Sequence, residues 1–257
     1  MKIPTNKFKA ALKAGKQQIG MWNSIGGQTV IEIIAGFGYD WVLIDTEHSP
    51  VEVTDVLPAL QAIAGYPDTS AVVRPAVNDP VLIKRYLDIG AQTLLIPYVQ
   101  SAAEAEAAVS AMRYPPNGIR GFAGLTRASR YGKAEKYATR AEEELCLLVQ
   151  VETKTALDRL EEIAAVDGVD GVFIGPADLA ASLGHPGDLT HPDVVSAIEG
   201  AIERLNSIGV PAGILSLDRA FAKRCIKLGT SFTAIGVDLG VLIVAMDDLT
   251  NDFRQSN

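Results

Sequence analysis

Cysteine and histidine are scarce in this 257-residue chain, which has two cysteines and three histidines. Two cysteines are too few for the disulfide framework that stabilises many small secreted domains. Cys146 and Cys225 each lie in an apolar run, which favours buried free thiols over a redox role. Three histidines also leave few candidates for acid–base chemistry near neutral pH.

Long hydrophobic runs and an excess of positive charge are absent as well. No uninterrupted apolar run approaches the ~20 residues of a membrane span, and the first residues lack the apolar core of a signal peptide. The formal net charge is −8, which argues against a nucleic acid or a membrane as a partner. We therefore expect a cytoplasmic protein.

The chain does contain a regular alternation of short apolar runs and helical patterns. The apolar runs predict strands at Gln18–Trp22, Trp41–Asp45, Ala71–Arg74, Thr93–Pro97, Leu145–Glu152, Gly171–Ile174, Pro211–Leu215 and Thr233–Val237. Patterns with a 3.6-residue period predict helices at Thr29–Ala35, Val53–Ala64, Pro80–Ile89, Ala102–Met112, Thr155–Ala164, Val194–Ile208, Asp218–Leu228 and Leu239–Leu249.

Eight strand–helix repeats with buried strands predict an α/β fold, a (β/α)8 barrel, in one domain over residues 1–257. A doubly wound open sheet is the alternative, but no Gly-x-Gly-x-x-Gly follows the first strand. One segment, Tyr114–Glu144, interrupts the repeat. It is too long for a plain connection, which predicts a functional loop.

Polar and ionisable residues gather where the predicted strands end. They are Trp22 and Asn23, then Asp45, Glu47 and His48, then Arg74, then Gln150 and Glu152, and finally Gly175, Pro176, Ala177 and Asp178. The predicted strands begin, by contrast, with mostly apolar or turn residues. Because strand-to-helix loops form the active face of such barrels, this asymmetry predicts an enzyme site at the carboxyl ends of the strands.

Glu152 and Asp178 follow strands that would be neighbours in the barrel. Two convergent carboxylates with room for water suit a hard cation such as Mg2+ or Mn2+. Two alternatives remain: Asp178 could cap the helix that follows it, and the pair could be a glycosidase-type acid and base. The backbone N–H groups of residues 175–178, at a helix start, could also bind a substrate carboxylate.

Arg74 and His48 are the other candidates for catalysis. Arg74 ends a strand with no other charge, so it needs an anionic partner such as a carboxylate or a developing enolate oxygen. The alternative is a structural pair with Glu47 or Asp45, and both could hold at once. His48 with Asp45 is predicted to form an acid–base dyad in which the carboxylate orients the imidazole. His185 and His191 lie in a Gly-, Pro- and Asp-rich loop and are assigned to solvent exposure or to packing of the loop.

Together these segments resemble one family, the metal-dependent pyruvate aldolases of the HpcH/HpaI type. The resemblance covers about residues 20–249 and rests on Asp40-Trp-Val-Leu-Ile-Asp-Thr-Glu-His48, Val72-Val-Arg-Pro75, Tyr114-Pro-Pro-Asn-Gly-Ile-Arg-Gly121, Leu148-Val-Gln-Val-Glu152 and Gly168-Val-Asp-Gly-Val-Phe-Ile-Gly-Pro-Ala-Asp-Leu179. The departures are Thr46, where many members have glycine, and the loop at Asn23, Ser24 and Ile25.

The resemblance implies a barrel of the phosphoenolpyruvate/pyruvate type that adds pyruvate, or a related 2-oxo acid such as hydroxypyruvate, reversibly to an aldehyde. It implies a divalent metal, Mg2+ or Mn2+ with Co2+ or Zn2+ as alternatives, on Glu152 and Asp178. It also implies a homo-oligomer, a hexamer built as a trimer of dimers, in which the last helix is exchanged between subunits.

The resemblance assigns individual roles as well. Arg74 would stabilise the enolate, and Asp45 with His48 would move protons, while Glu47 would orient Arg74 or a water on the metal. Asp88 would reach a neighbouring subunit's site. The expected substrate-binding residues are Trp22, Gln150, Gly175, Pro176, Ala177, Leu215 and Val237.

Two other functions compete with the aldolase. The first is a citrate-lyase-like acyl-CoA lyase of the same barrel group, for which the arginines of the 114–144 segment would have to form a CoA groove. The second is a non-catalytic binding barrel, which the full set of strand-end charges disfavours. No lysine ends a predicted strand, which argues against a Schiff-base aldolase.

Overall fold

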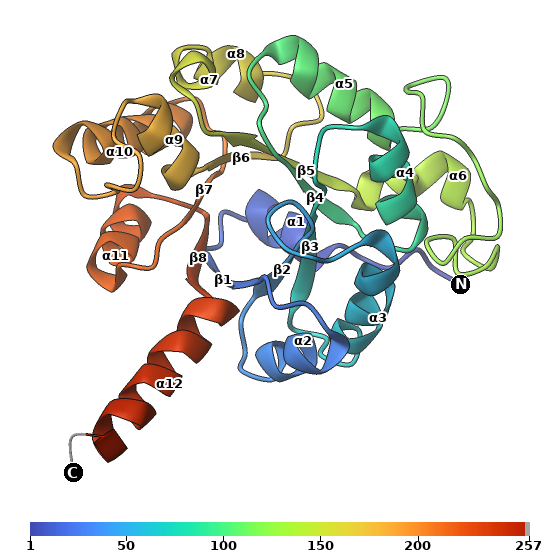
Figure 1. Ribbon diagram of the computed structural model, residues 1–257. Helices are drawn as coiled ribbons and strands as arrows, with labels where there is room; N and C mark the ends of the chain where they lie inside the picture. Colours follow the sequence, from blue (N-terminus) through green and yellow to red (C-terminus); the bar gives the residue numbers. More distant parts are fainter. Residues whose placement is uncertain (255–257) are drawn as a thin grey trace.

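Eight parallel strands close into a barrel in the computed structural model, which describes residues 1–254 (Figure 1). Each strand pairs with its neighbour in chain order, and β8 closes the barrel against β1. The strands are β1 Gln18–Asn23, β2 Trp41–Asp45, β3 Ser70–Arg74, β4 Thr93–Ile96, β5 Cys146–Val151, β6 Gly171–Ile174, β7 Ala212–Leu215 and β8 Phe232–Val237. The predicted barrel is confirmed, and each predicted strand boundary differs from the observed one by at most one residue.

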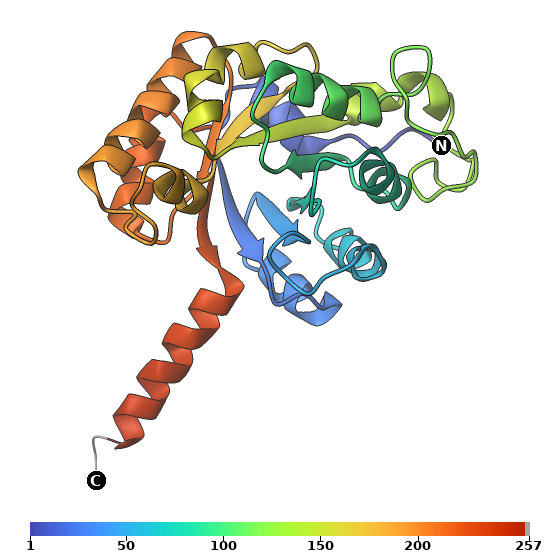
Figure 2. The same cartoon turned by 45° about the horizontal axis from the view of Figure 1, so that its top comes forward.

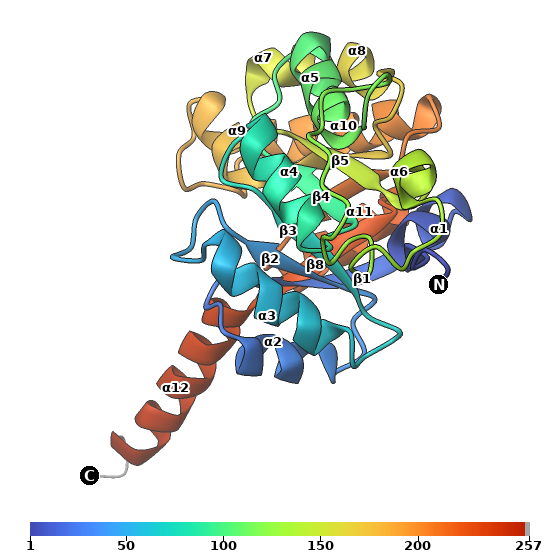
Figure 3. The ribbon, with the colours of Figure 1, turned by 90° about the vertical axis from the view of Figure 1, so that its right-hand side faces the viewer.

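Helices surround the strands and connect them (Figures 1 and 3). They are α1 Lys7–Lys13, α2 Gln28–Ala35, α3 Val53–Ile63, α4 Pro80–Asp88, α5 Ala102–Met112, α6 Tyr137–Arg140, the short 3-10 helix η1 Ala141–Glu144, α7 Lys154–Asp158, α8 Leu160–Ala164, α9 Pro176–Ser182, α10 Pro192–Ser207, α11 Arg219–Leu228 and α12 Asp238–Arg254. The predicted helix Thr155–Ala164 is divided at Arg159, so α7 and α8 are separate.

Side chains of each strand alternate between the barrel interior and the surrounding helices, as the two-residue period of a strand requires. In β2, Trp41 and Leu43 belong to the interior cluster, and Val42 and Ile44 belong to the cluster under the helices. Both faces of β2 are buried, which explains its continuous apolar sequence. The same alternation places Asp45, the last residue of β2, on the interior face at the mouth of the barrel.

Glycines make room for aromatic rings inside the barrel. A Cβ atom on Gly20 would lie 2.1 Å from the indole of Trp41, and one on Gly213 would lie 2.1 Å from the ring of Phe232. The absence of a side chain at these positions therefore lets the large rings fill the interior at the density of a packed core.

Helix α1 closes the end of the barrel at which the strands begin, and the sequence did not predict it. Phe8 is fully buried and packs edge-to-face on Trp41 and Phe232, with ring centroids 5.9 Å and 5.7 Å apart. Its N-cap residue, Asn6, accepts a hydrogen bond from the backbone N–H of Lys9. Among residues 1–254, this helix covers the strand starts, and the other end of the interior layer is the mouth at the carboxyl ends of the strands.

Helix α12 projects away from the barrel (Figure 2). Asp238 is its only buried residue within the described part of the chain. Five apolar side chains with 43% to 73% exposure recur along it at intervals of three and four residues, namely Leu239, Leu242, Met246, Leu249 and Phe253. This spacing forms one continuous stripe on a helix, and the stripe faces solvent in a single chain.

Two further expectations concern the thiols and the membrane. Cys146 and Cys225 are buried and free, as predicted. No helix within residues 1–254 combines the length and the hydropathy that crossing a membrane requires.

Candidate active site

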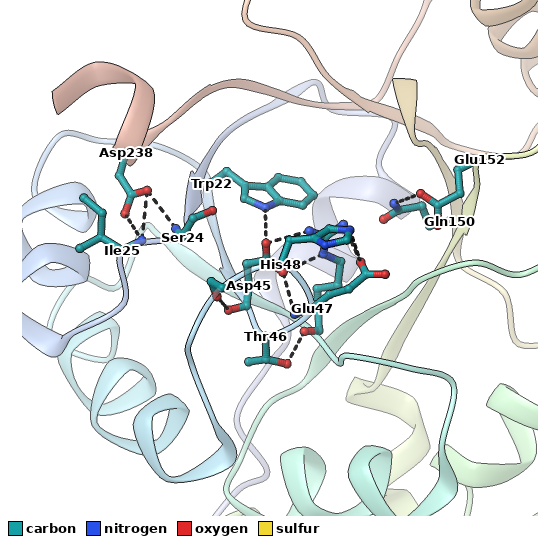
Figure 4. Close-up of polar contacts among 12 residues, drawn as sticks. Trp22, Ser24, Ile25, Asp45, Thr46, Glu47, His48, Gln150, Glu152 and Asp238 are labelled. Atoms are coloured by element: carbon teal, nitrogen blue, oxygen red, sulfur yellow. Dashed lines mark hydrogen bonds and ion pairs between the residues drawn. The ribbon is translucent and has the colours of Figure 1, made fainter. Parts of the chain in front are cut away.

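Polar side chains at the ends of β1, β2 and β5 lie at the open mouth of the barrel (Figure 4), and Arg74 ends β3 beside them. Trp22, Asp45, Glu47 and His48 lie on one side, and Gln150 and Glu152 lie across the mouth from them. The strand register explains the first group, because Asp45 on β2 is directly paired with Arg74 on β3. The structure thus brings most of the predicted site residues to one end of the barrel.

Arg74 and Asp45 form a buried bidentate ion pair. The Nε atom of Arg74 donates to Oδ1 of Asp45 at 2.9 Å, and its Nη2 atom donates to Oδ2 at 2.7 Å. The side chains are only 7% and 2% exposed. A planar guanidinium held side-on by a carboxylate has one allowed orientation, so this pair fixes the direction in which Arg74 points.

Glu47 and Trp22 complete the setting of Arg74. Nη1 of Arg74 lies 2.8 Å from Oε2 of Glu47, and the guanidinium carbon lies 4.9 Å from the centre of the Trp22 ring. The indole N–H of Trp22 donates to Oδ2 of Asp45 at 3.3 Å. Arg74 is therefore held by two carboxylates and stacked on an aromatic ring. The expected pairing of Arg74 with Glu47 and Asp45 is present with both.

Thr46 supports the backbone of the same arginine. Its N–H and its hydroxyl both donate to the carbonyl of Arg74, at 3.0 Å and 2.6 Å. The hydroxyl of Tyr86, on α4, donates in turn to Oγ1 of Thr46 at 2.9 Å. A glycine at position 46 could provide only the backbone bond, so this chain anchors β3 to β2 and α4 through a side chain.

The predicted dyad of His48 with Asp45 is not formed. Both oxygens of Asp45 are already occupied by Arg74, by the indole of Trp22 and by the backbone N–H of Glu47 at 3.0 Å. His48 is 65% exposed, and its closest carboxylate is that of Glu47, with Nε2 and Oε2 3.9 Å apart. Of the two partners that the sequence offered Asp45, Arg74 on the paired strand is the one that contacts both of its oxygens.

The two carboxylates around Arg74 respond to it differently. Burial alone would raise the pKa of Asp45, but the hydrogen bonds and the charge of Arg74 outweigh burial and hold that pKa below its usual value. For Glu47 burial prevails, and the pKa is raised in spite of Arg74, with Asp45 and Asp178 adding repulsion. Asp45 therefore remains an anion that orients Arg74, and Glu47 is the carboxylate that binds a proton more readily.

Glu152 is a buried carboxylate without a cationic partner. It is 2% exposed, and its oxygens accept hydrogen bonds from the backbone N–H of Tyr98 at 2.7 Å and from the amide of Gln150. Within residues 1–254, no cationic side chain forms an ion pair with it. The side-chain oxygen of Gln150, Oε1, is buried and has no hydrogen-bond partner among these residues. These oxygens therefore leave acceptor capacity unused in a buried site.

The electrostatics of Glu152 fit a divalent cation. Burial raises the pKa of Glu152 to about 7, against the hydrogen bonds from Gln150 and Tyr98, and the charges of Glu47 and Asp178 raise it further. Three carboxylates that repel one another, with all donors to Glu152 neutral, form the kind of oxygen-rich site that Mg2+ or Mn2+ binds. The residues present thus fit the metal that the resemblance implies.

Helix α9 presents Asp178 to this group from its first turn. The helix starts at Pro176, and its first internal hydrogen bond runs from the N–H of Leu179 to the carbonyl of Gly175 at 3.1 Å. The N–H groups of Ala177 and Asp178 therefore stand outside the helical ladder. Gly175 is required for the close approach, because a Cβ there would lie 2.6 Å from Oε2 of Glu152 and 3.0 Å from Nε2 of Gln150.

Apolar side chains and a cavity border the mouth. Leu215 and Val237, at the ends of β7 and β8, are partly buried and pack on the interior cluster. A cavity of about 590 Å³ opens beside Glu47 and Tyr98, between the loops that follow β3 and β4. Another, of about 390 Å³, lies near the strand starts around α1 and contains none of the predicted site residues.

Asp88 does not belong to this chain's own site. It ends α4, which runs back from the mouth to the opposite end of the barrel, and Oδ1 of Asp88 accepts a hydrogen bond from Arg120 at 2.7 Å. The Arg120 side chain is completely buried, so Asp88 is tied to the 114–144 segment. A role in a neighbouring subunit's site stays a prediction.

Asp238, the first residue of α12, holds the loop that follows β1. Its carboxylate accepts hydrogen bonds from the side chain of Asn23 at 2.6 Å and from the N–H groups of Ser24 at 2.9 Å and Ile25 at 3.1 Å (Figure 4). Asp238 is 6% exposed. The unusual loop sequence noted above is thus the binding partner of the helix that leaves the barrel.

Two contributors escaped the sequence prediction. Tyr98 acts through its backbone N–H and has a left-handed φ of 55°, a conformation that is uncommon for a residue with a side chain. The side chain of Tyr98 gives no indication that its backbone N–H contacts Glu152. Tyr86 lies on a helix and reaches the site only through Thr46.

This chain is similar in sequence and in structure to known proteins. A sequence model described as HpcH/HpaI aldolase/citrate lyase matches residues 18–245. A protein of Rhizobium etli named pyruvate aldolase is 62% identical over 98% of this chain and 99% of its own length. A hydroxypyruvate/pyruvate aldolase of Sagittula stellata is 56% identical over 95% and 96%. The crystal structure of an HpcH/HpaI aldolase/citrate lyase family protein from Burkholderia cenocepacia superposes with a TM-score of 0.93 at 38% identity, covering 97% of this chain and all of that one.

The raised pKa of Glu152 predicts a pH dependence of stability in metal-free protein. The folded state holds a proton on Glu152 up to about pH 7, whereas the unfolded chain releases it near pH 4.5. The resulting stabilisation is complete below pH 4.5 and is lost as the pH rises through 7, by an amount on the order of 3 kcal/mol. We expect Glu152→Gln, which stays neutral, to flatten this part of the profile.

The measurement is the free energy of unfolding in urea, between about pH 4 and pH 8, for protein dialysed free of metal. Glu162→Gln, the same substitution on the exposed surface of α8, should keep the wild-type slope. Identical slopes in the wild type and Glu152→Gln would show that Glu152 titrates like a solvent-exposed carboxyl group.

Proposed function

We propose, because this chain belongs to the HpcH/HpaI aldolase/citrate lyase family, that it catalyses the reversible aldol addition of pyruvate, or a related 2-oxo acid such as hydroxypyruvate, to an aldehyde. The chain is an enzyme, a carbon–carbon lyase of the aldolase kind. The observation that carries the proposal is the arrangement at the mouth of the barrel. A fixed arginine lies on one side of it, and a buried carboxylate group without a cation lies on the other.

The competing acyl-CoA lyase is the less favoured reading. The arginines that would have to form a CoA groove have other partners here: Arg120 binds Asp88, and Arg127 donates to the carbonyl of Ile89 at 2.9 Å. The relatives at 62% and 56% identity are named aldolases. The product is therefore expected to be a 2-oxo-4-hydroxy acid.

Glu152 and Asp178 are the residues that would hold a divalent cation, Mg2+ or Mn2+. When bound, the cation supplies Lewis-acid polarisation of the 2-oxo acid. Gln150 orients Glu152 through its amide, and its free Oε1 faces the same buried site. The N–H groups of Ala177 and Asp178 are available to the substrate carboxylate at the start of α9.

Arg74 stabilises the negative charge of the enolate. A guanidinium has five N–H donors, and hydrogen bonds to Asp45 engage two of them, while Nη1 lies 2.8 Å from Oε2 of Glu47 as an ion pair without hydrogen-bond geometry. The remaining donors are available to a substrate oxygen, in a position that the two carboxylates and the Trp22 ring have already fixed. Donors that need no reorganisation are the ones that lower a barrier most.

His48 moves the proton of the aldehyde-derived hydroxyl. It is exposed at the mouth, where an incoming aldehyde must pass, and its neighbour is Glu47. We assign Asp45 to positioning Arg74, because both of its oxygens are already occupied. Leu215 and Val237 provide an apolar wall for the aldehyde on the side of β7 and β8.

We further propose that α12 binds another copy of this chain. Its apolar stripe, Leu239, Leu242, Met246, Leu249 and Phe253, is exposed in the single chain, and its spacing is that of helices packed against one another. An exchange of this helix between subunits, within a hexamer, would cover the stripe and bring Asp88 of one copy toward the site of another.

The charge and the free thiols favour a cytoplasmic location.

An assay with defined products tests the aldolase directly. Purified protein is dialysed free of metal and incubated with pyruvate and glycolaldehyde, and the 2-oxo-4-hydroxy acid is measured by mass spectrometry. We expect no product without metal, product with Mg2+ or Mn2+, and loss of product in Glu152→Gln but not in Glu162→Gln. Undiminished activity after metal removal would refute the metal assignment, and cleavage of an acyl-CoA instead would support the lyase.

Replacement of Arg74 by lysine tests its role in the reaction. Lysine keeps the charge but loses the fork, so kcat should fall roughly 100- to 1,000-fold, while KM for pyruvate changes much less. Arg204→Lys is the matched control, because Arg204 forms a similar two-point ion pair with Glu161 on the outer surface. A change confined to KM would mean that Arg74 only binds the substrate.

The oligomer is tested by placing charge on the stripe. We expect Leu242→Asp with Leu249→Asp to lower the mass measured by light scattering to that of one chain, because buried unpaired carboxylates oppose association. Val244→Asp with Asn251→Asp adds the same charge, at the same seven-residue spacing, to the opposite and exposed face of α12 and should keep the wild-type mass. An unchanged mass in the first variant would exclude the stripe from the interface.

A further inference from the structure

The loop between α9 and α10 brings the two histidines outside the active site together. The rings of His185 and His191 are stacked, with centroids 3.4 Å apart and planes inclined by 15°. The side chains are 25% and 33% exposed. Gly184 and Gly187, with φ of 91° and 81°, turn the chain so that the loop closes on itself. The packing role expected from the sequence accounts for a loop contact but not for a third residue beside the rings.

That third residue is Asp193, in the first turn of α10. Its Oδ2 atom lies 3.5 Å from Nε2 of His185 and 3.7 Å from Nδ1 of His191, and one ligand atom of each residue lies within 4.8 Å of the others. In a tetrahedral zinc site with bonds of about 2.0–2.2 Å, neighbouring ligand atoms are about 3.4 Å apart. Both contacts to Asp193 are therefore close to that separation, and a shared zinc ion requires the two stacked rings to rotate until their nitrogen lone pairs converge.

We propose that His185, His191 and Asp193 form a second metal site, which binds Zn2+. Two imidazoles and one carboxylate are a ligand set that zinc prefers, whereas the oxygen-only group at Glu152 and Asp178 suits harder cations. The Asp193 side chain is 73% exposed, so water can fill the fourth position. The site needs no residue from the aldolase centre, and it stands or falls independently of the proposed reaction.

Helix capping is the competing explanation for part of this geometry. Nδ1 of His191 accepts a hydrogen bond from the backbone N–H of Asp193 at 3.2 Å, at the start of α10. Capping explains His191, but it does not explain why His185 lies over the ring and beside the same carboxylate. When zinc binds Nδ1 of His191, the backbone N–H of Asp193 loses this hydrogen bond. Because that N–H is exposed, it can donate to water instead.

Zinc at this position would fasten the end of one helix to the start of the next. Its ligands come from the loop after α9 and from the first turn of α10. Asp178 lies in the first turn of α9, about 6 Å by helical rise from Ser182, the last residue of that helix. The metal is thus a brace for the segment that carries Asp178 and lies outside the reaction centre itself.

Zinc binding can be measured with the aldolase centre excluded. Wild-type protein saturated with Mg2+, and in parallel the variant Glu152→Gln/Asp178→Asn, are titrated with Zn2+ by calorimetry. We expect one zinc per chain in the variant and at least one in the wild type, where Zn2+ can also replace Mg2+ at Glu152 and Asp178. His185→Gln and His191→Gln should each weaken zinc binding by at least about a hundredfold, because each removes a ligand. Loss of a residue that only hydrogen-bonds to a ligand can already weaken binding by about that factor. His48→Gln, the same change at the remaining histidine, should leave it intact.

A second readout needs no substitution. Diethyl pyrocarbonate modifies accessible imidazoles, and the chain has only three, so mass spectrometry can follow each one. With Mg2+ present, Zn2+ should protect His185 and His191 and leave the 65% exposed His48 reactive. Co2+ bound in place of Zn2+ should give the intense visible absorption of a tetrahedral ion. The proposal is overturned if no zinc binds in the Glu152→Gln/Asp178→Asn variant, if His185→Gln binds like the wild type, or if zinc protects His48 alone.

Discussion

The ion pair between Asp45 and Arg74 is the contact on which the rest of the site depends. It joins the ends of two neighbouring strands that are directly paired in the barrel, so the register of β2 and β3 sets it before any loop is considered. The fixed guanidinium then sets where its further partners lie. Trp22 lies against its face, and Glu47 lies beside Nη1. A buried arginine with this many constraints can present its remaining donors to only one point.

Burial has the opposite consequence on the other side of the mouth. Glu152 is as deeply buried as Asp45, but its hydrogen-bond donors are neutral, and its pKa rises to about 7 where that of Asp45 falls. Asp45 is paired with the built-in cation of Arg74, whereas Glu152 has no cationic partner and is repelled by Glu47 and Asp178. One side of the site therefore carries its own positive charge, and the other is arranged to receive one.

The sequence predicted the strands well because most strand residues are buried on both faces, and short, nearly continuous apolar runs mark such strands clearly. The two-residue alternation also indicated which strand-end residues point inward. It could not predict the partner of Asp45, because Arg74 and His48 are equally plausible until the register of β3 is known. Nor could it find Tyr98, whose contribution is a backbone N–H, or α1, whose seven residues hold too few periodic positions.

The direction in which α12 leaves the barrel is fixed by contacts at its first residue. Asp238 is buried, and it holds the loop after β1 by its side chain, so the direction of the helix is fixed where it begins. That loop follows Trp22, which supports both Asp45 and Arg74. A short series of contacts, from Asp238 through Asn23, thus links the start of α12 to the strand end that carries Trp22 beneath the arginine.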